Sequence, residues 1–127
     1  MAYTKAGLSP DGSSSYYLPR LIGLRRAQDL MLTNRTLTAA EALEWGLVTR
    51  VVEQDRLTSA ARDIAKDLAS GSQSANAAVK KLLMTSFTHS LETQMEIEGR
   101  AIAACAAASD GREGITAFVE KRIPNFL

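Results

Sequence analysis

Signals that start and stop helices recur along most of this chain of 127 residues. Thr38 and Glu41 have the spacing of a capping box, and Gly46 follows as a typical helix end. Ser90 is a good N-cap residue in front of another apolar stripe. This pattern predicts a mostly α fold.

The same signals predict seven helices. These are a short helix ending at Ile22, Leu24–Thr33, residues 39–45, Arg56–Ala69 capped by Asp55, Ala75–Phe87 capped by Ser74, a helix opened by Ser90, and a last one that begins at Ser109 and is ended by Pro124. The one β-branched stretch, Leu47–Val52, predicts a short strand, and residues 1–8 could be the end of another. We therefore expect at most a short strand pair beside the helices.

The composition narrows the possible functions. Hydrophobic residues make up 46% of the chain and charged residues 23%, as in ordinary globular proteins, and the net charge of +1 does not suggest a polyanion binder. No apolar run approaches the roughly 18 residues of a membrane span, and we expect no secretion, because the N-terminal sequence has no apolar signal-peptide core. With one cysteine, Cys105, and one histidine, His89, we expect neither a disulfide nor a zinc site, in a cytoplasmic protein.

A tight turn is predicted at residues 9–12, where the sequence reads Ser-Pro-Asp-Gly. Taken alone, this pattern favours a type I turn or a helix cap for Asp11. His89 fits a loop or cap position, and Cys105 fits a small packing residue among alanines. Neither is expected to act as a base or a nucleophile.

Four stretches, in order and spacing, resemble the crotonase (enoyl-CoA hydratase/isomerase) superfamily. They are residues 7–15 (GLSPDGSSS) with 18–23 (LPRLIG), residues 37–48 (LTAAEALEWGLV), the pair Val51–Val52, and residues 110–122 (DGREGITAFVEKR). Together they extend over nearly the whole chain. The resemblance implies the C-terminal helical portion of a crotonase-like α/β spiral fold, because the chain is similar to only the C-terminal half of a family member.

The resemblance also implies a division of the chain. Residues 1–54 would form the end of the spiral core with an active-site turn, and residues 55–127 a C-terminal helical region for oligomerisation. The N-terminal half of a family chain would carry most of the CoA-binding surface. It would also carry the two backbone N–H donors that hold the thioester oxygen.

The resemblance implies that Asp11 is the catalytic acid and base. Double-bond isomerases, ring-epoxide isomerases of phenylacetyl-CoA breakdown and aryl-CoA dehalogenases of the family carry an acid at this position. Family hydratases use two glutamates, of which one position matches Tyr3 and the other would lie in the absent half. We expect an acyl-CoA isomerase that works through an enolate, closest to the ring-epoxide isomerases. The alternatives are an enoyl-CoA hydratase and a non-catalytic helical oligomerisation module.

Ligands and partners follow from the same resemblance. Lys121 would help to hold the CoA bound to a neighbouring subunit, whereas the simpler interpretation is a favourable charge at a helix C-terminus. Tyr16 could line an acyl pocket, although half-buried packing is the simpler interpretation. We expect an acyl-CoA substrate, a homotrimer or hexamer, no metal, and no cofactor beyond the coenzyme A of the substrate. No nucleic-acid or membrane partner is expected.

Overall fold

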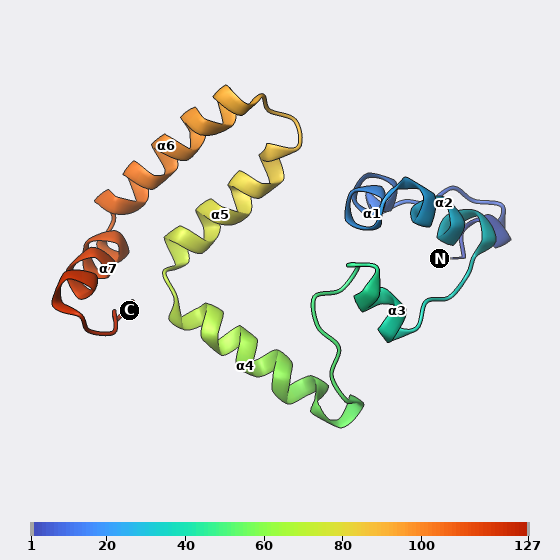
Figure 1. The fold of residues 1–127 in the computed structure, drawn as a ribbon, viewed down its shortest axis with the longest axis horizontal. Helices are drawn as coiled ribbons and strands as arrows, with labels where there is room; N and C mark the ends of the chain where they lie inside the picture. Colours follow the sequence, from blue (N-terminus) through green and yellow to red (C-terminus); the bar gives the residue numbers. More distant parts are fainter. Residues whose placement is uncertain (1, 127) are drawn as a thin grey trace. The chain divides into compact units, whose positions relative to one another are not determined.

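The computed structural model describes residues 2–126. The chain divides between Asp55 and Arg56 into two compact units. The first contains the 3₁₀ turn η1 (Thr4–Ala6) and the helices α1 (Ser14–Ile22), α2 (Leu24–Thr33) and α3 (Ala39–Glu44), and the second contains α4 (Leu57–Ser70), α5 (Gln73–Ser86), α6 (Leu91–Ala107) and α7 (Ser109–Glu120) (Figure 1). A further 3₁₀ turn, η2, covers Gln54–Arg56. The predicted mostly α fold with seven helices is confirmed for residues 2–126.

A small apolar core holds the first unit together where α1 and α2 pack against each other. Leu18 and Ile22 of α1 and Ala27 and Leu30 of α2 are buried in it. Gly23 separates the two helices and has φ = 82°, a left-handed region that costs glycine nothing. Partly buried side chains cover this core, namely Met31, Leu37, Trp45 and Leu47.

The predicted capping box of α3 is present. The Thr38 hydroxyl accepts from the Glu41 N–H at 3.2 Å, and the Glu41 carboxylate accepts from the Thr38 N–H at 2.9 Å. The pKa of Glu41 is lowered, first by this backbone hydrogen bond from Thr38 and then by its hydroxyl. Gly46 follows with φ = 74°, as expected of a helix end.

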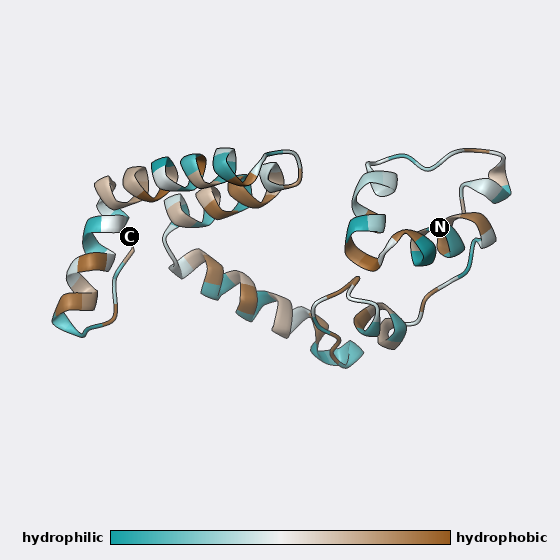
Figure 2. Cartoon of the chain, turned by 45° about the horizontal axis from the view of Figure 1, so that its top comes forward, coloured by the Kyte–Doolittle hydropathy of each residue, from teal (hydrophilic) through white to brown (hydrophobic). Residues whose placement is uncertain are grey.

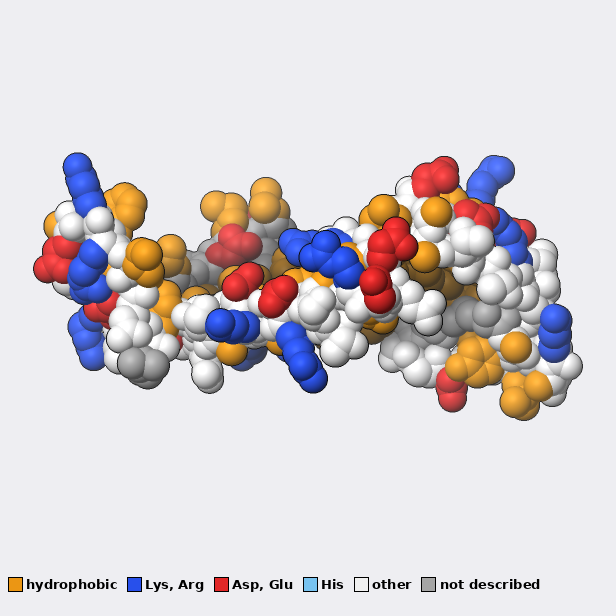
Figure 3. Space-filling model, turned by 90° about the horizontal axis from the view of Figure 1, so that it is seen from below, with side chains coloured by type: hydrophobic (Ala, Val, Ile, Leu, Met, Phe, Trp, Pro, Cys, Tyr) orange, Lys and Arg blue, Asp and Glu red, His pale blue; other side chains and the backbone are white. Residues whose placement is uncertain are grey.

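The second unit has almost no buried core. Within the part of it that the structure describes, Ala117 alone is buried. Helices α5 and α6 lie side by side, and α7 packs against α6 (Figure 1). Apolar residues occur along all four helices of this unit (Figure 2), and many remain exposed, among them Leu68, Leu83, Ile102 and Phe118. Apolar side chains stand among charged ones on the surface drawn in Figure 3.

The corner between α6 and α7 depends on a glycine. A Cβ atom added to Gly111 would lie 1.9 Å from the carbonyl oxygen of Cys105 and 2.8 Å from the Cα of Ala106. Real side chains do not approach backbone atoms so closely, so the start of α7 can pack on the end of α6 only where residue 111 has no side chain.

The strand predicted at Leu47–Val52 is wrong, because the described residues contain no strand. The N–H groups of Leu47 and Val48 both donate to the carbonyl oxygen of Ala42, at 2.8 and 3.2 Å, and so close the end of α3. Val51 and Val52 are exposed. A strand needs a partner to pair its backbone groups, and neither unit offers one here. Residues 4–6 form η1 instead of a strand end.

Two predicted helix caps are also wrong. Asp55 lies within η2, and the N-cap of α4 is Arg56 without a side-chain hydrogen bond. The cap of α5 is Ser72, whose hydroxyl accepts from the Ala75 N–H at 3.2 Å, instead of Ser74. The cap of α6 at Ser90 is confirmed. No helix in residues 2–126 has the length and apolarity that crossing a bilayer requires.

Candidate functional site

Asp11 lies in an exposed turn immediately before α1. Gly12 and Ser13 both have left-handed backbone angles, φ = 59° and 62°. Ser14 then donates twice to the carbonyl oxygen of Asp11, through its N–H at 3.1 Å and its hydroxyl at 2.7 Å. The backbone of Asp11 is thereby fixed to the first turn of α1, while its carboxylate remains accessible.

The serines after Asp11 do not cap α1 through a side chain. The N-cap is Ser13, and its hydroxyl makes no capping hydrogen bond. A usual N-cap has extended backbone angles that point the hydroxyl at the free N–H groups, whereas Ser13 is left-handed. The start of α1 therefore does not place a serine oxygen where a cap would lie.

The carboxylate of Asp11 has a side-chain partner that the sequence did not reveal. The hydroxyl of Tyr3 donates to Oδ1 of Asp11 at 2.7 Å. The hydrogen bond to the carboxylate, and after it the negative charge, raise the pKa of Tyr3. Sequence reasoning treated Tyr3 only as a residue that cannot replace a glutamate. Tyr3 stands eight positions before Asp11, and no local sequence signal pairs the two residues.

Tyr16, another predicted site residue, lies in the first turn of α1 and is half-buried. Its ring meets that of Tyr17 edge to face, with 5.1 Å between ring centroids. The guanidinium of Arg20 lies 3.7 Å from the centroid of the Tyr16 ring and donates to the Tyr16 carbonyl oxygen at 2.7 Å. Tyr16 therefore has the packing contacts of a surface aromatic residue, and its place in an acyl pocket stays a prediction.

Lys121 belongs to the second unit, where it ends α7 with left-handed backbone angles, φ = 55°. Its N–H donates to the Phe118 carbonyl oxygen at 3.3 Å, and the N–H of Arg122 donates to Ala117 at 3.0 Å. Its side chain is exposed at a helix C-terminus, where the helix dipole favours a cation. This position suits both the structural interpretation of Lys121 and a role in binding an anion.

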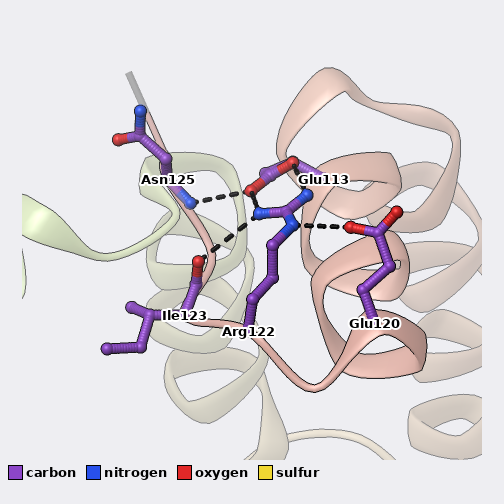
Figure 4. Close-up of polar contacts among 5 residues, drawn as sticks. All are labelled: Glu113, Glu120, Arg122, Ile123 and Asn125. Atoms are coloured by element: carbon purple, nitrogen blue, oxygen red, sulfur yellow. Dashed lines mark hydrogen bonds and ion pairs between the residues drawn. The ribbon is translucent and has the colours of Figure 1, made fainter.

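A cluster of polar contacts fixes the chain directly after Lys121 (Figure 4). Arg122 donates to both carboxylate oxygens of Glu113, at 2.6 and 2.9 Å, and through Nε to Glu120 at 2.6 Å. The N–H of Asn125 donates to Glu113 at 2.8 Å. We call these four residues the C-terminal clasp. The Arg122 guanidinium, and then the Asn125 N–H, lower the pKa of Glu113 to about 2.

A second polar contact ties α5 to α7. The carboxylate of Asp110 accepts from the hydroxyls of Ser72 at 2.8 Å and Ser74 at 3.2 Å. The pKa of Asp110 is lowered, chiefly by the hydrogen bond from Ser72. Ser74 does not cap α5 because the helix already begins at Gln73, which places Ser74 in its first turn.

The single histidine and the single cysteine of the sequence lie in the second unit. His89 lies between α5 and α6, with its Nδ1 3.3 Å from Oε1 of Gln94. Cys105 is half-buried near the end of α6. Among residues 2–126 no three His, Cys, Asp or Glu side chains gather in a way that could hold a metal ion. Of the predicted site residues, Asp11 is the one with a carboxylate, and Tyr3 is its side-chain hydrogen-bond partner.

Comparison with known proteins places this geometry in context. The family model described as enoyl-CoA hydratase/isomerase matches residues 1–127. A 1,2-epoxyphenylacetyl-CoA isomerase of Escherichia coli is 35% identical over 99% of this chain and 48% of its own length. A 4-chlorobenzoyl coenzyme A dehalogenase of Arthrobacter is 36% identical over 96% of this chain and 44% of its own.

A solved structure gives the same result for the fold. The crystal structure of an enoyl-CoA hydratase from Bacillus anthracis matches with a TM-score of 0.88 at 35% identity, over 97% of this chain and 48% of that chain. The chain spans about half the length of the curated relatives it matches.

Proposed function

Because the chain belongs to the enoyl-CoA hydratase/isomerase family, we propose that it is the C-terminal portion of an isomerase of acyl-CoA thioesters. The reaction would move a double bond, or rearrange a ring epoxide, through an enolate. The observation that carries the proposal is the exposed carboxylate of Asp11, whose side-chain partner is the phenol of Tyr3, at the position where a family hydratase has one of its two glutamates. One carboxylate suits a proton that leaves and returns, whereas the hydration of a double bond in this family uses two.

For the movement of a double bond, the proton steps balance with Asp11 alone. Its carboxylate takes a proton from a carbon in conjugation with the thioester, the C–H electrons move into the enolate, and the same proton is returned to another carbon. A positioned general base contributes about 10² to 10⁴ in rate. The enolate forms only where preorganised donors hold the thioester oxygen, each worth about 3 to 4 kcal/mol. We assign those donors to an N-terminal half like that of the relatives.

We assign substrate binding to Lys121 and Tyr16. The exposed ammonium of Lys121 at the C-terminal end of α7 would pair with a phosphate of CoA, as a charge-assisted contact. Tyr16 would line the acyl pocket next to Asp11, on the first turn of α1. The coenzyme A of the substrate is the only cofactor that this reaction requires.

Assembly into a homotrimer or hexamer is part of the proposal. A groove between α5 and α6 is lined by apolar side chains, including Val79, Leu82, Met95 and Ile102. Large exposed apolar surfaces of this kind mark interfaces. The same observation supports the second candidate function, a helical oligomerisation module without activity of its own. An enoyl-CoA hydratase is the remaining alternative, because a hydratase is among the structures that match.

The deciding experiment replaces Asp11 in the full-length protein that carries this sequence. Asp11→Asn keeps the size and hydrogen-bonding capacity of the side chain but removes the base. We expect turnover of acyl-CoA substrates to fall by about 10² to 10⁴ while CoA binding is retained. Asp63→Asn, at an exposed position on α4, is the matched control and should leave turnover unchanged. Full activity in Asp11→Asn would refute the assignment.

A further inference from the structure

The hydrogen bond between Tyr3 and Asp11 joins a half-buried side chain to an exposed one. The phenol hydroxyl of Tyr3 donates to Oδ1 of Asp11, and the two oxygens are 2.7 Å apart, which is the distance of a strong O–H···O⁻ hydrogen bond. Because a carboxylate has two oxygens, this contact makes them different: Oδ1 is held, and Oδ2 is the oxygen left for another partner.

The backbone keeps Tyr3 in this position. Its carbonyl oxygen accepts from the N–H groups of Ala6 at 2.9 Å and Leu8 at 3.0 Å, so the chain closes tightly behind it. Gly7, with φ = 71°, allows this closure. The ring of Tyr3 is thereby held next to the turn that carries Asp11.

The turn that bears Tyr3 is also tied to the end of α2. The hydroxyl of Thr4 donates to the Met31 carbonyl oxygen at 3.2 Å and accepts from the side-chain amide of Asn34 at 2.5 Å. These contacts connect residues about thirty positions apart in the sequence. Tyr3 is therefore anchored to the packed pair α1 and α2, and not only to its own loop.

We propose that Tyr3 is a positioning residue for Asp11: by donating to Oδ1 it directs the transferred proton to Oδ2. This inference rests on the proposed catalytic role of Asp11. When Oδ2 accepts a proton from substrate, Oδ1 becomes the carbonyl oxygen of a neutral acid and still accepts from the phenol. The carboxyl group then returns the proton from the same oxygen without rotating. The raised pKa of Tyr3 supports a phenol that stays protonated throughout.

The first test changes the phenol in the full-length protein. Tyr3→Phe keeps the ring and removes the donor. We expect kcat to fall about 10- to 100-fold, the worth of one hydrogen bond to a charged group, with KM and the midpoint of thermal unfolding unchanged. Thr33→Val is the matched control, because it deletes a hydroxyl of α2 that bonds within its own helix, and it should leave kcat unchanged.

The second test needs no activity and uses the 127-residue chain. With tyrosine labelled at the ring carbon that bears oxygen, NMR follows the ionisation of Tyr3 as pH rises. In Asp11→Asn the pKa of Tyr3 should fall, because its largest cause of elevation is removed. An unchanged titration would show that the pair does not form in solution and would overturn the inference, even if Tyr3→Phe failed to fold.

The two proposals fail in different ways. An inactive Asp11→Asn beside a fully active Tyr3→Phe would overturn the positioning role and leave the base assignment standing. A fully active Asp11→Asn would remove both. A Tyr3→Phe enzyme that lost activity only through a higher KM or a lower unfolding midpoint would give Tyr3 a structural role and overturn the inference as well.

Discussion

The two units are stabilised by different kinds of contact. The first buries Leu18, Ile22, Ala27 and Leu30 in a core shared by α1 and α2. The second has Ala117 as its one buried residue among those described, and its corners are defined by the close contact at Gly111 and by polar clusters. A unit with a core can hold the turn of Asp11 in place by itself. A unit without one leaves apolar helix faces exposed, and such faces are typical of protein interfaces.

The largest expected effect is the loss of stability when a buried core side chain of the first unit is shortened. Leu30 is 4% exposed and Leu32, in the same helix, is 70% exposed. Leu30→Ala removes buried methyl groups and leaves a cavity, so we expect a loss of about 2–5 kcal/mol in the free energy of unfolding. Leu32→Ala should change it by about 0.5 kcal/mol or less. The fluorescence of Trp45, the single tryptophan, reports this unit, because Trp45 packs against its core.

A Leu→Ala substitution in the second unit should cost less free energy of unfolding than Leu30→Ala. Leu68→Ala on α4 removes a side chain that is 60% exposed. Equal losses for Leu30→Ala and Leu68→Ala in the isolated chain would contradict the contrast between the units. A large loss for Leu68→Ala that appears only in the full-length protein would support it, because the covering surface would then be present.

The next largest effect is expected at the corner of α6 and α7. Gly111→Ala places a methyl group against the backbone of Cys105, and overpacking of this kind costs typically about 1–3 kcal/mol. Hydrogen exchange of the α7 amides should become faster. Gly99→Ala is the matched control within α6, where a Cβ meets nothing within 4 Å. It should stabilise the helix by up to about 1 kcal/mol. Slower or unchanged exchange in Gly111→Ala would show that the corner adjusts freely.

Local signals explain what could be predicted of the fold. The capping box of Thr38 and Glu41 and the cap at Ser90 depend on residues three positions apart, so their sequence spacing is sufficient. The strand predicted at Leu47–Val52 failed for the opposite reason. Its β-branched residues favour extended backbone, but pairing depends on a second strand, which a local pattern cannot supply.

The site features that could not be predicted from the sequence depend on contacts between residues that are not neighbours in the chain. Ser74 is a residue type that often caps helices, yet α5 begins one residue before it, and its hydroxyl donates to Asp110, 36 positions away. Asp11 could be predicted from its turn and from the family resemblance of the residues around it. Tyr3 is its partner because η1 folds into a tight turn whose Thr4 is hydrogen-bonded to α2. Partners at such separations follow from packing, which spacing along the chain does not encode.

A cap should have a smaller effect than the core of the same unit. Thr38→Ala removes the hydroxyl that accepts from Glu41, and the loss of such a cap costs about 0.5–2 kcal/mol. The change should appear in Trp45 fluorescence, because Trp45 ends α3. Thr36→Ala, at an exposed position before the helix, should have little effect. A loss as large as that of Leu30→Ala would mean that α3, and not the core, governs the first unit.

The smallest expected effect concerns the clasp, and it depends on pH. Glu113 has a pKa of about 2 in the folded chain, below the ordinary glutamate value near 4.3. A group whose folded pKa is lowered contributes stability above its unfolded pKa, and this contribution is lost as pH falls toward the folded value. Between about pH 4 and pH 2 the C-terminal segment should therefore loosen progressively, most directly at the N–H of Asn125, which donates to Glu113.

The NMR shift of the Asn125 amide measures this change. In the unaltered chain it should move with a midpoint near pH 2, where Glu113 becomes protonated. Glu113→Gln should abolish the titration, because the amide has no carboxylate left to follow. Glu120→Gln removes the charge of a different partner of Arg122 and should leave the Asn125 titration in place. A midpoint near the ordinary glutamate value would show that Arg122 does not hold Glu113 in solution. The segment after Lys121 would then not be held by the clasp in the isolated chain.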